Sequence, residues 1–309
     1  MTDPTTHAVL LEILRTNSEE LKRTRRWHLI LRLLSSGFML LLVGLSLFAW
    51  WKSYTATHQP HAAVVRIEGE IAANSKGGAD AVITGLRSAF AATEAKAVVI
   101  EINSPGGSPV QAGMIHNEIK RLRGKHPDKS VVAVIDDMGA SGGYYVAVAA
   151  DRIFANPASL VGSIGVRLDS FGFTDAMNRL GVERRLYTAG KYKGVMDMFT
   201  PVDPAAETQI HGMLDTVHRQ FIDAVKSGRG SRLKDDPILF TGMFWSGEEG
   251  LQLGLIDGFG DRRQVIEQQF NLDTVLDYTP AEDVFKQLGK FQTSVSLLMS
   301  TLSGVPALR

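Results

Sequence analysis

The sequence predicts an α/β domain that follows a single transmembrane helix, and two observations support this expectation. Residues 33–51 carry no charged side chain and are long enough to cross a bilayer as a helix. Beyond residue 62, apolar runs rich in β-branched residues alternate with segments of helical periodicity. Alternation of strands and helices along a chain is typical of an α/β fold.

Composition excludes several classes of function. The chain has 309 residues, and its 33 Lys and Arg balance its 33 Asp and Glu, so the formal net charge is +0. A neutral chain has no overall basic field to attract nucleic acid. The absence of cysteine excludes disulfides, cysteine-ligated zinc and a cysteine nucleophile.

The apolar segment has the flanks of a membrane anchor. Tryptophans border it at Trp27, Trp50 and Trp51, where an interfacial belt would lie. Basic residues precede it, namely Lys22, Arg23, Arg25, Arg26 and Arg32. Lys52 is the only basic residue between the segment and Arg66, so the positive-inside rule places the N-terminus in the cytoplasm.

We therefore expect a cytoplasmic segment at 1–27, a transmembrane signal anchor at 28–52 and a polar linker at 53–62. A cleaved signal peptide is an alternative, but the apolar core is too long for one and no small-x-small site follows it. A buried helix of a soluble core is a second alternative.

The elements beyond the linker follow from hydrophobic periodicity. Strands are expected at 62–71, 95–102, 130–136, 152–156 and 183–188, and helices at 79–92, 110–123 and 203–226. The apolar stripe of the last helix is expected to pack in the core.

Chemistry-bearing residues collect in the loops 102–109, 138–150, 160–166 and 187–201, and open α/β sheets place their sites in loops that follow strands. Each loop also has an ordinary interpretation. Residues 102–109 could be a plain strand–helix turn, and Ser141 in 138–150 could be a helix cap. Residues 160–166 could be a bare turn, and the lysines of 187–201 could be solvated.

Ser141 precedes two glycines at the start of a small-residue apolar run, which is the pattern of a nucleophile at a helix N-terminus. A serine nucleophile needs a base, and no histidine occurs between His126 and His211. Lysine is the alternative base when it is desolvated enough to be neutral. Lys191 and Lys193 are the candidates, so the chain reads as a Ser–Lys hydrolase.

Taken together, the motifs SPGG, ASGGYY, VGSIGV and KYKG resemble, in order and spacing, the signal peptide peptidase A family in its short, single-copy form. The resemblance covers about residues 63–265 and includes the closing segment 244–260. It implies a Clp protease/crotonase-like fold of ββα repeats and a Ser–Lys peptidase domain at 63–270. It implies no cofactor and no metal.

The resemblance also assigns roles to single residues. Ser141 matches the nucleophile and Lys193 the general base, whereas Lys191 matches a solvated neighbour. Ser163 matches a serine that hydrogen-bonds the catalytic lysine and holds it in place. The loop glycines match the oxyanion loop, which assigns a backbone N–H to Gly107.

Gly142, beside the nucleophile, is the expected second oxyanion donor. Asp136 and Asp137 precede the serine motif, which departs from the family pattern. A carboxylate near Lys193 would favour the charged lysine and oppose its action as a base.

The resemblance implies a membrane-anchored serine endopeptidase that degrades remnant signal peptides or other extended apolar peptides, with its catalytic domain on the periplasmic side of the inner membrane. It implies a homo-oligomeric ring in which Ser141 and Lys193 meet across a subunit boundary. The tail 271–309, with helical spacing at 282–304, is expected to serve assembly or lie on the membrane surface. An acyl-CoA enzyme and an inactive scaffold on the same fold remain alternatives.

Overall fold

The computed structural model describes residues 27, 31–52, 54–55 and 57–281. Most of the expected cytoplasmic segment 1–27 and all of the expected tail helix 282–304 lie outside these residues. The chain divides into two compact units, Met1–Gln59 and Pro60–Arg309. In the first unit, the helix Leu31–Lys52 has a mean hydropathy of 2.0 and none of it is buried, so it is long and apolar enough to cross a membrane.

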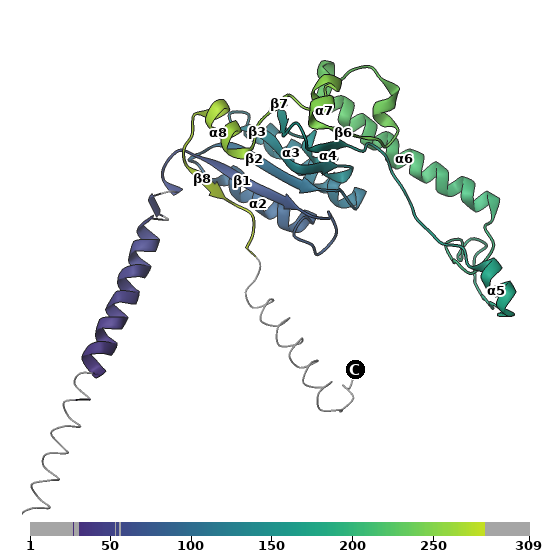
Figure 1. Cartoon of the computed structure of the whole chain (residues 1–309), viewed down its shortest axis with the longest axis horizontal. Helices are drawn as coiled ribbons and strands as arrows, with labels where there is room; N and C mark the ends of the chain where they lie inside the picture. Colours follow the sequence, from purple (N-terminus) through teal and green to yellow (C-terminus); the bar gives the residue numbers. More distant parts are fainter. Residues whose placement is uncertain (1–26, 28–30, 53, 56, 282–309) are drawn as a thin grey trace, which may run out of the picture. The chain divides into compact units, whose positions relative to one another are not determined.

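The second unit is built on a largely parallel sheet (Figure 1). Its strands are β1 His61–Glu68, β2 Ala95–Ser104, β3 Ser130–Ala140, β4 Arg152–Ala155, β5 Leu160–Gly162, β6 Phe244–Ser246, β7 Gly258–Phe259 and β8 Val275–Asp277. The main path runs β6-β5-β3-β2-β1-β8, while β4 pairs with β3 and β7 with β4. Among these pairs only β5 and β6 run antiparallel.

The helices are α2 Ala79–Ala91, α3 Pro109–Lys125, α4 Gly142–Ala147, α5 Thr174–Leu180, α6 Pro204–Arg229, α7 Gly247–Leu253 and α8 Arg262–Phe270. Short 3-10 turns occupy Gly230–Arg232 and Pro237–Phe240. The element order confirms the predicted α/β class.

The central strands are apolar along their whole length because both faces of the sheet are covered. On one face, alternate β1 residues such as Val65 and Ile67 share a buried cluster with side chains of α2, α3 and α4. On the other face, Val64 of β1 packs in a second cluster that includes Val265 and Ile266 of α8. Strand β8 pairs with β1, so the sheet extends beyond the expected domain boundary at residue 270.

Two expectations for the segment between β5 and β6 are wrong. Residues 183–188 form no strand, and almost all side chains from 167 to 202 are exposed. Helix α6 buries Phe221 and Val225 of its apolar stripe, but Met213 is 51% exposed. The apolar periodicity therefore reports core packing only in the C-terminal half of α6. Figure 1 shows α6 leading from the sheet region to the segment that carries α5.

Candidate active site

Ser141 lies at the junction between β3 and α4, as predicted, in a strained backbone conformation. Its φ is 50° and its ψ is −121°, values that a side-chain-bearing residue rarely adopts. Its N–H donates to the Gly162 carbonyl at 2.8 Å, and its carbonyl accepts from the Tyr145 N–H at 2.9 Å. The Ser141 hydroxyl makes no capping bond, which argues against a plain helix cap. Strain of this kind costs about 1–3 kcal/mol and clusters at functional sites.

Gly106 allows the loop after β2 to pack directly against the Ser141 turn. A Cβ built on Gly106 would lie 2.5 Å from the Gly142 nitrogen and 2.8 Å from the Ser141 Cβ. Real side chains do not tolerate such distances, so the backbone approach requires glycine at this position.

The backbone N–H of Gly107 lies beside the Ser141 turn. Ile71 bridges Gly107 in parallel fashion: its N–H donates to Gly106 O at 2.7 Å, and its carbonyl accepts from Ser108 N–H at 2.8 Å. In such a bridge the N–H of Gly107 itself points away from Ile71. The Gly107 nitrogen lies 3.3 Å from a Cβ built on Gly142.

Neither the Gly107 N–H nor the Gly142 N–H donates to another group within the described part of the chain. Gly142 opens α4, and the first N–H groups of a helix have no intrahelical acceptor. Two backbone donors therefore stand free beside Ser141, the arrangement that stabilises an oxyanion.

Ser141, Gly107, Gly142 and Ser163 line one cavity of about 880 Å³. Apolar side chains form part of its wall, namely Val217, Phe221 and Phe244. Glu70 and Asp169, which the sequence interpretation did not single out, add carboxylates to the lining and are exposed.

Lys193 is not part of this cavity. It is exposed in a turn in which its N–H donates to the Gly190 carbonyl at 3.1 Å. Lys191 lies over the Tyr192 ring at 4.9 Å. A single copy of the described chain therefore gathers Ser141, Gly107, Gly142 and Ser163 but leaves Lys193 apart from them.

A histidine base is not available in the described part of the cavity, because no histidine lines it. His218 comes nearest by sequence, on α6 beside Val217, and its Nε2 lies 3.1 Å from the Ile164 carbonyl. A carbonyl only accepts, so this nitrogen donates and cannot take a proton from serine.

Residues 123–275 match the sequence family described as peptidase family S49. The putative signal peptide peptidase SppA of Enterococcus faecium is 28% identical over 191 residues, which cover 59% of this chain and 54% of the relative. The chain is thus similar to peptidase family S49 over residues 123–275, slightly less than half of its length. The predicted relation to signal peptide peptidases is therefore confirmed at the level of the family.

Two further comparisons concern an antiporter and a solved protease structure. The Na(+)/H(+) antiporter NhaA of Brucella abortus (strain 2308) is 45% identical over 185 residues, covering 60% of this chain but 25% of that protein. The chain thus spans about a quarter of the antiporter's length and about half of the Enterococcus peptidase. A solved structure, the 1510-N membrane-bound stomatin-specific protease S97A mutant, is 17% identical with a TM-score of 0.45, covering 72% of this chain and 99% of its own.

Ser104 supports the glycine loop after β2, and the sequence analysis did not identify this role. It is fully buried; its hydroxyl donates to the Gly69 carbonyl at 2.6 Å and accepts from the Gly106 N–H at 3.1 Å. Its place in the motif NSPGG was the available signal, because a serine two residues before a glycine turn can bond its own loop.

Ser163 also has a positive φ, 52°, and its N–H donates to the Met243 carbonyl at 2.8 Å. If Ser163 orients the catalytic lysine, as the resemblance implies, Ser163→Ala should lower kcat about threefold to tenfold, the loss expected for one hydrogen bond. Steady-state peptide hydrolysis checks this, with unfolding midpoints as the control for folding. An unchanged turnover together with an unchanged pH–rate profile would remove Ser163 from the site.

The pKa of Asp136 is shifted by burial and by charged groups other than Lys193. Burial first, and then the charge of Glu101, raises the pKa of Asp136 to about 6, while Arg262 opposes the shift. Lys193 is not among the charges that act on this carboxyl. The concern that Asp136 would hold Lys193 in its charged form therefore finds no support within one chain.

The raised pKa of Asp136 predicts that ionisation of this carboxyl lowers the stability of the folded chain as the pH rises. The folded state binds the Asp136 proton more tightly than the unfolded state, so the cost is absent below about pH 4 and is complete above about pH 6. Asp136→Asn should raise the free energy of unfolding by about 1 kcal/mol at pH 8, after discounting for solvent screening, and by nothing at pH 4. Denaturant unfolding at both pH values tests this, with the exposed Asp235→Asn as the control. An equal gain at pH 4 would contradict the assignment.

Proposed function

We propose that this chain is a membrane-anchored serine endopeptidase with a Ser–Lys dyad, in which Ser141 is the nucleophile and Lys193 the general base. The observation that carries the proposal is the strained Ser141 beside the two free N–H groups of Gly107 and Gly142, in a cavity that no described histidine lines. A lysine supplied from outside the cavity completes this arrangement.

The proposed reaction begins when neutral Lys193 takes the proton of the Ser141 hydroxyl, whose oxygen attacks a peptide carbonyl carbon. The N–H groups of Gly107 and Gly142 hold the negative charge that develops on the carbonyl oxygen, at about 3–4 kcal/mol per donor in well-studied serine hydrolases. As the intermediate collapses, protonated Lys193 gives its proton to the leaving amine, and the acyl group stays on Ser141 as an ester. Water then attacks the ester and restores the serine, with Lys193 as base.

Lys193 comes from a neighbouring subunit in this proposal. Its segment exposes apolar side chains that have little cover within one copy, including Phe171 at 73% and Tyr187 at 89% exposed. Covering such side chains stabilises association. A ring closed by head-to-tail contacts would bring each Lys193 to the cavity of the next copy.

The apolar wall formed by Val217 and Phe221 suits extended apolar peptides. Remnant signal peptides are the substrate class we propose, in line with the name of the Enterococcus relative. The helix Leu31–Lys52 would anchor the protein in the inner membrane, with the N-terminus in the cytoplasm and the catalytic domain in the periplasm.

An inactive scaffold on the same fold is the competing function. Purified full-length protein should cleave an apolar peptide library, and a serine-reactive phosphonate should label it at one site. Labelling that persists in Ser141→Ala would place the nucleophile elsewhere, and neither cleavage nor labelling in a verified oligomer would favour the scaffold.

A further inference from the structure

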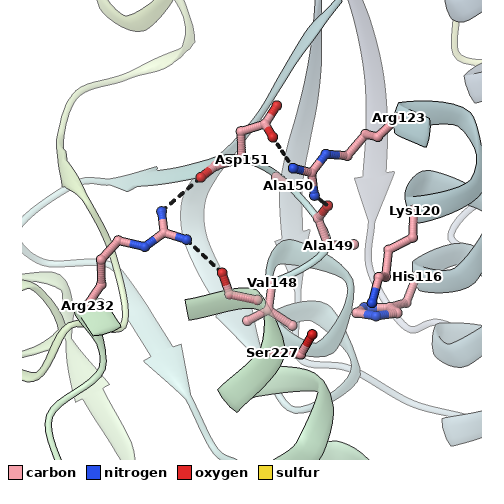
Figure 2. A pocket seen from close by; sticks show the side chains of 10 residues that line it. His116, Lys120, Arg123, Val148, Ala149, Ala150, Asp151, Ser227 and Arg232 are labelled. Atoms are coloured by element: carbon pink, nitrogen blue, oxygen red, sulfur yellow. Dashed lines mark hydrogen bonds and ion pairs between the residues drawn. The ribbon is translucent and has the colours of Figure 1, made fainter. Parts of the chain in front are cut away.

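A second cavity, of about 300 Å³, lies at the end of α4 opposite Ser141 (Figure 2). Basic side chains dominate its lining: His116, Lys120, Arg123 and Arg232. Asp151 is the acidic residue among the described lining residues, and its carboxylate already pairs with Arg123. Lys120 and Arg232 therefore add positive charge that Asp151 does not balance.

The two arginines are fixed by backbone carbonyls. Arg123 Nη1 donates to Ala149 O at 2.6 Å, while Arg232 donates through Nη1 to Asp151 O at 2.8 Å and through Nη2 to Gly228 O at 2.6 Å. Arg232 also contacts the Asp257 carboxylate at 3.1 Å. Both guanidinium groups thus hold their charge at the cavity without needing to rearrange when a ligand arrives.

Lys120 and Ser227 are the adaptable polar groups of the lining. Both are exposed, and within the described residues neither the Lys120 ammonium nor the Ser227 hydroxyl has a hydrogen-bond partner. Figure 2 shows Lys120 reaching beside His116 from α3, and Ser227 rising from α6.

His116, a buried residue, adds a ring nitrogen to the cavity. The residue is 5% exposed, and its Nδ1 donates to the Tyr145 carbonyl at 2.9 Å, which leaves Nε2 without a partner among the described residues. Burial lowers the pKa of His116, and the charges of Lys120 and Arg123 lower it further. Without an anion the ring is therefore held neutral, and an anion at Nε2 would favour its protonated, donating form.

We propose that this cavity binds a phosphate group, carried either by free inorganic phosphate or by the headgroup of a phosphate-monoester lipid. The Lys120 ammonium, the Ser227 hydroxyl and the His116 Nε2–H are hydrogen-bond donors, and the fixed arginines add the field that a dianion requires. A neighbouring cavity of about 520 Å³ shares Lys120, Arg123 and Asp151, and it leaves room for the remainder of a larger ligand.

The test follows the carbon-bound imidazole protons of His116 by NMR in the full-length protein, held in phosphatidylcholine nanodiscs. The His116 signal is assigned by its loss in His116→Gln. Inorganic phosphate, added at constant ionic strength with sodium chloride as the reference, should shift this signal saturably and move its titration to higher pH. The charges that act on the ring are those of Lys120 and Arg123, and Asp151 and Arg232 are the other charged residues of the lining, so removing Lys120 should change the response.

Lys120→Gln should weaken phosphate binding about tenfold, the loss expected for one charge-assisted hydrogen bond. Lys120 is exposed and has no partner among the described residues, so the unfolding midpoint should not change. Lys125→Gln is the matched control, because Lys125 is exposed on the same helix and lines neither cavity. The Lys125→Gln variant should bind phosphate with the same affinity as the unaltered chain.

A second arm distinguishes the sources of the phosphate. If nanodiscs that contain phosphatidic acid shift the His116 signal without added phosphate, the lipid headgroup occupies the cavity. If only inorganic phosphate shifts it, the ligand is soluble. No saturable shift in either arm, or equal weakening by Lys120→Gln and Lys125→Gln, would overturn the proposal. Peptide hydrolysis is not part of the readout, so this result stands apart from the proposed peptidase function.

Discussion

Mixing protomers that carry Ser141→Ala with protomers that carry Lys193→Ala is expected to restore part of the peptidase activity that each variant lacks. Under the proposed function, each variant alone should lose about 10⁴-fold or more, because it removes either the nucleophile or the general base. Within one chain Ser141 lines the cavity, whereas Lys193 is exposed and does not. A mixed oligomer would contain sites with an intact serine from one copy and an intact lysine from the next.

Random assembly of equal amounts sets the scale, since about one site in four would keep both groups if each site draws on two subunits. Co-expression of two differently tagged variants, followed by tandem purification, gives oligomers of verified composition. Lys191→Ala is the matched control and should remain close to full activity on its own. Verified mixed oligomers without recovery would show that each subunit builds its own dyad.

Ser141→Gly should abolish peptide hydrolysis and phosphonate labelling while making the folded chain more stable. The serine holds a positive φ of 50°, which glycine adopts without a steric penalty. Relief of this strain should raise the free energy of unfolding by about 1 kcal/mol. Ser141→Ala should be equally inactive but should gain no stability, because it keeps the Cβ.

Denaturant unfolding of the three proteins, under identical solvent conditions, measures the difference. A Ser141→Gly variant no more stable than Ser141→Ala would mean that the turn is relaxed rather than strained. Retained hydrolysis in either variant would remove Ser141 from the reaction altogether.

The central strands of the sheet could be predicted from the sequence because both of their faces are buried. The runs at 95–102 and 130–136 are apolar throughout, and they appear as β2 and β3 with slightly longer bounds. The short strands β6 and β7 were missed because two or three residues carry too little periodicity to detect. β8 was missed in the same way, and it extends the sheet into the segment expected to be tail.

The sequence also predicted where the glycine loop and the Ser141 turn lie. Glycine beside serine pointed to the close backbone approach that Gly106 and Ser141 make, since only glycine fits there. The exposed segment 167–202 was harder, because its apolar residues imitate the pattern of packed elements. Periodicity reports that a face is apolar and does not report whether the same chain covers it.

The distance in sequence and space between the Ser141 cavity and the exposed Lys193 makes a lone protomer latent under the proposed function. A newly inserted copy would carry a nucleophile without a base and a base without a nucleophile, and would be harmless to the proteins around it. Activity would then rise more steeply than in proportion to the amount of protein in the membrane, because each working site needs an encounter between copies. The number of copies per area of membrane would then control the activity.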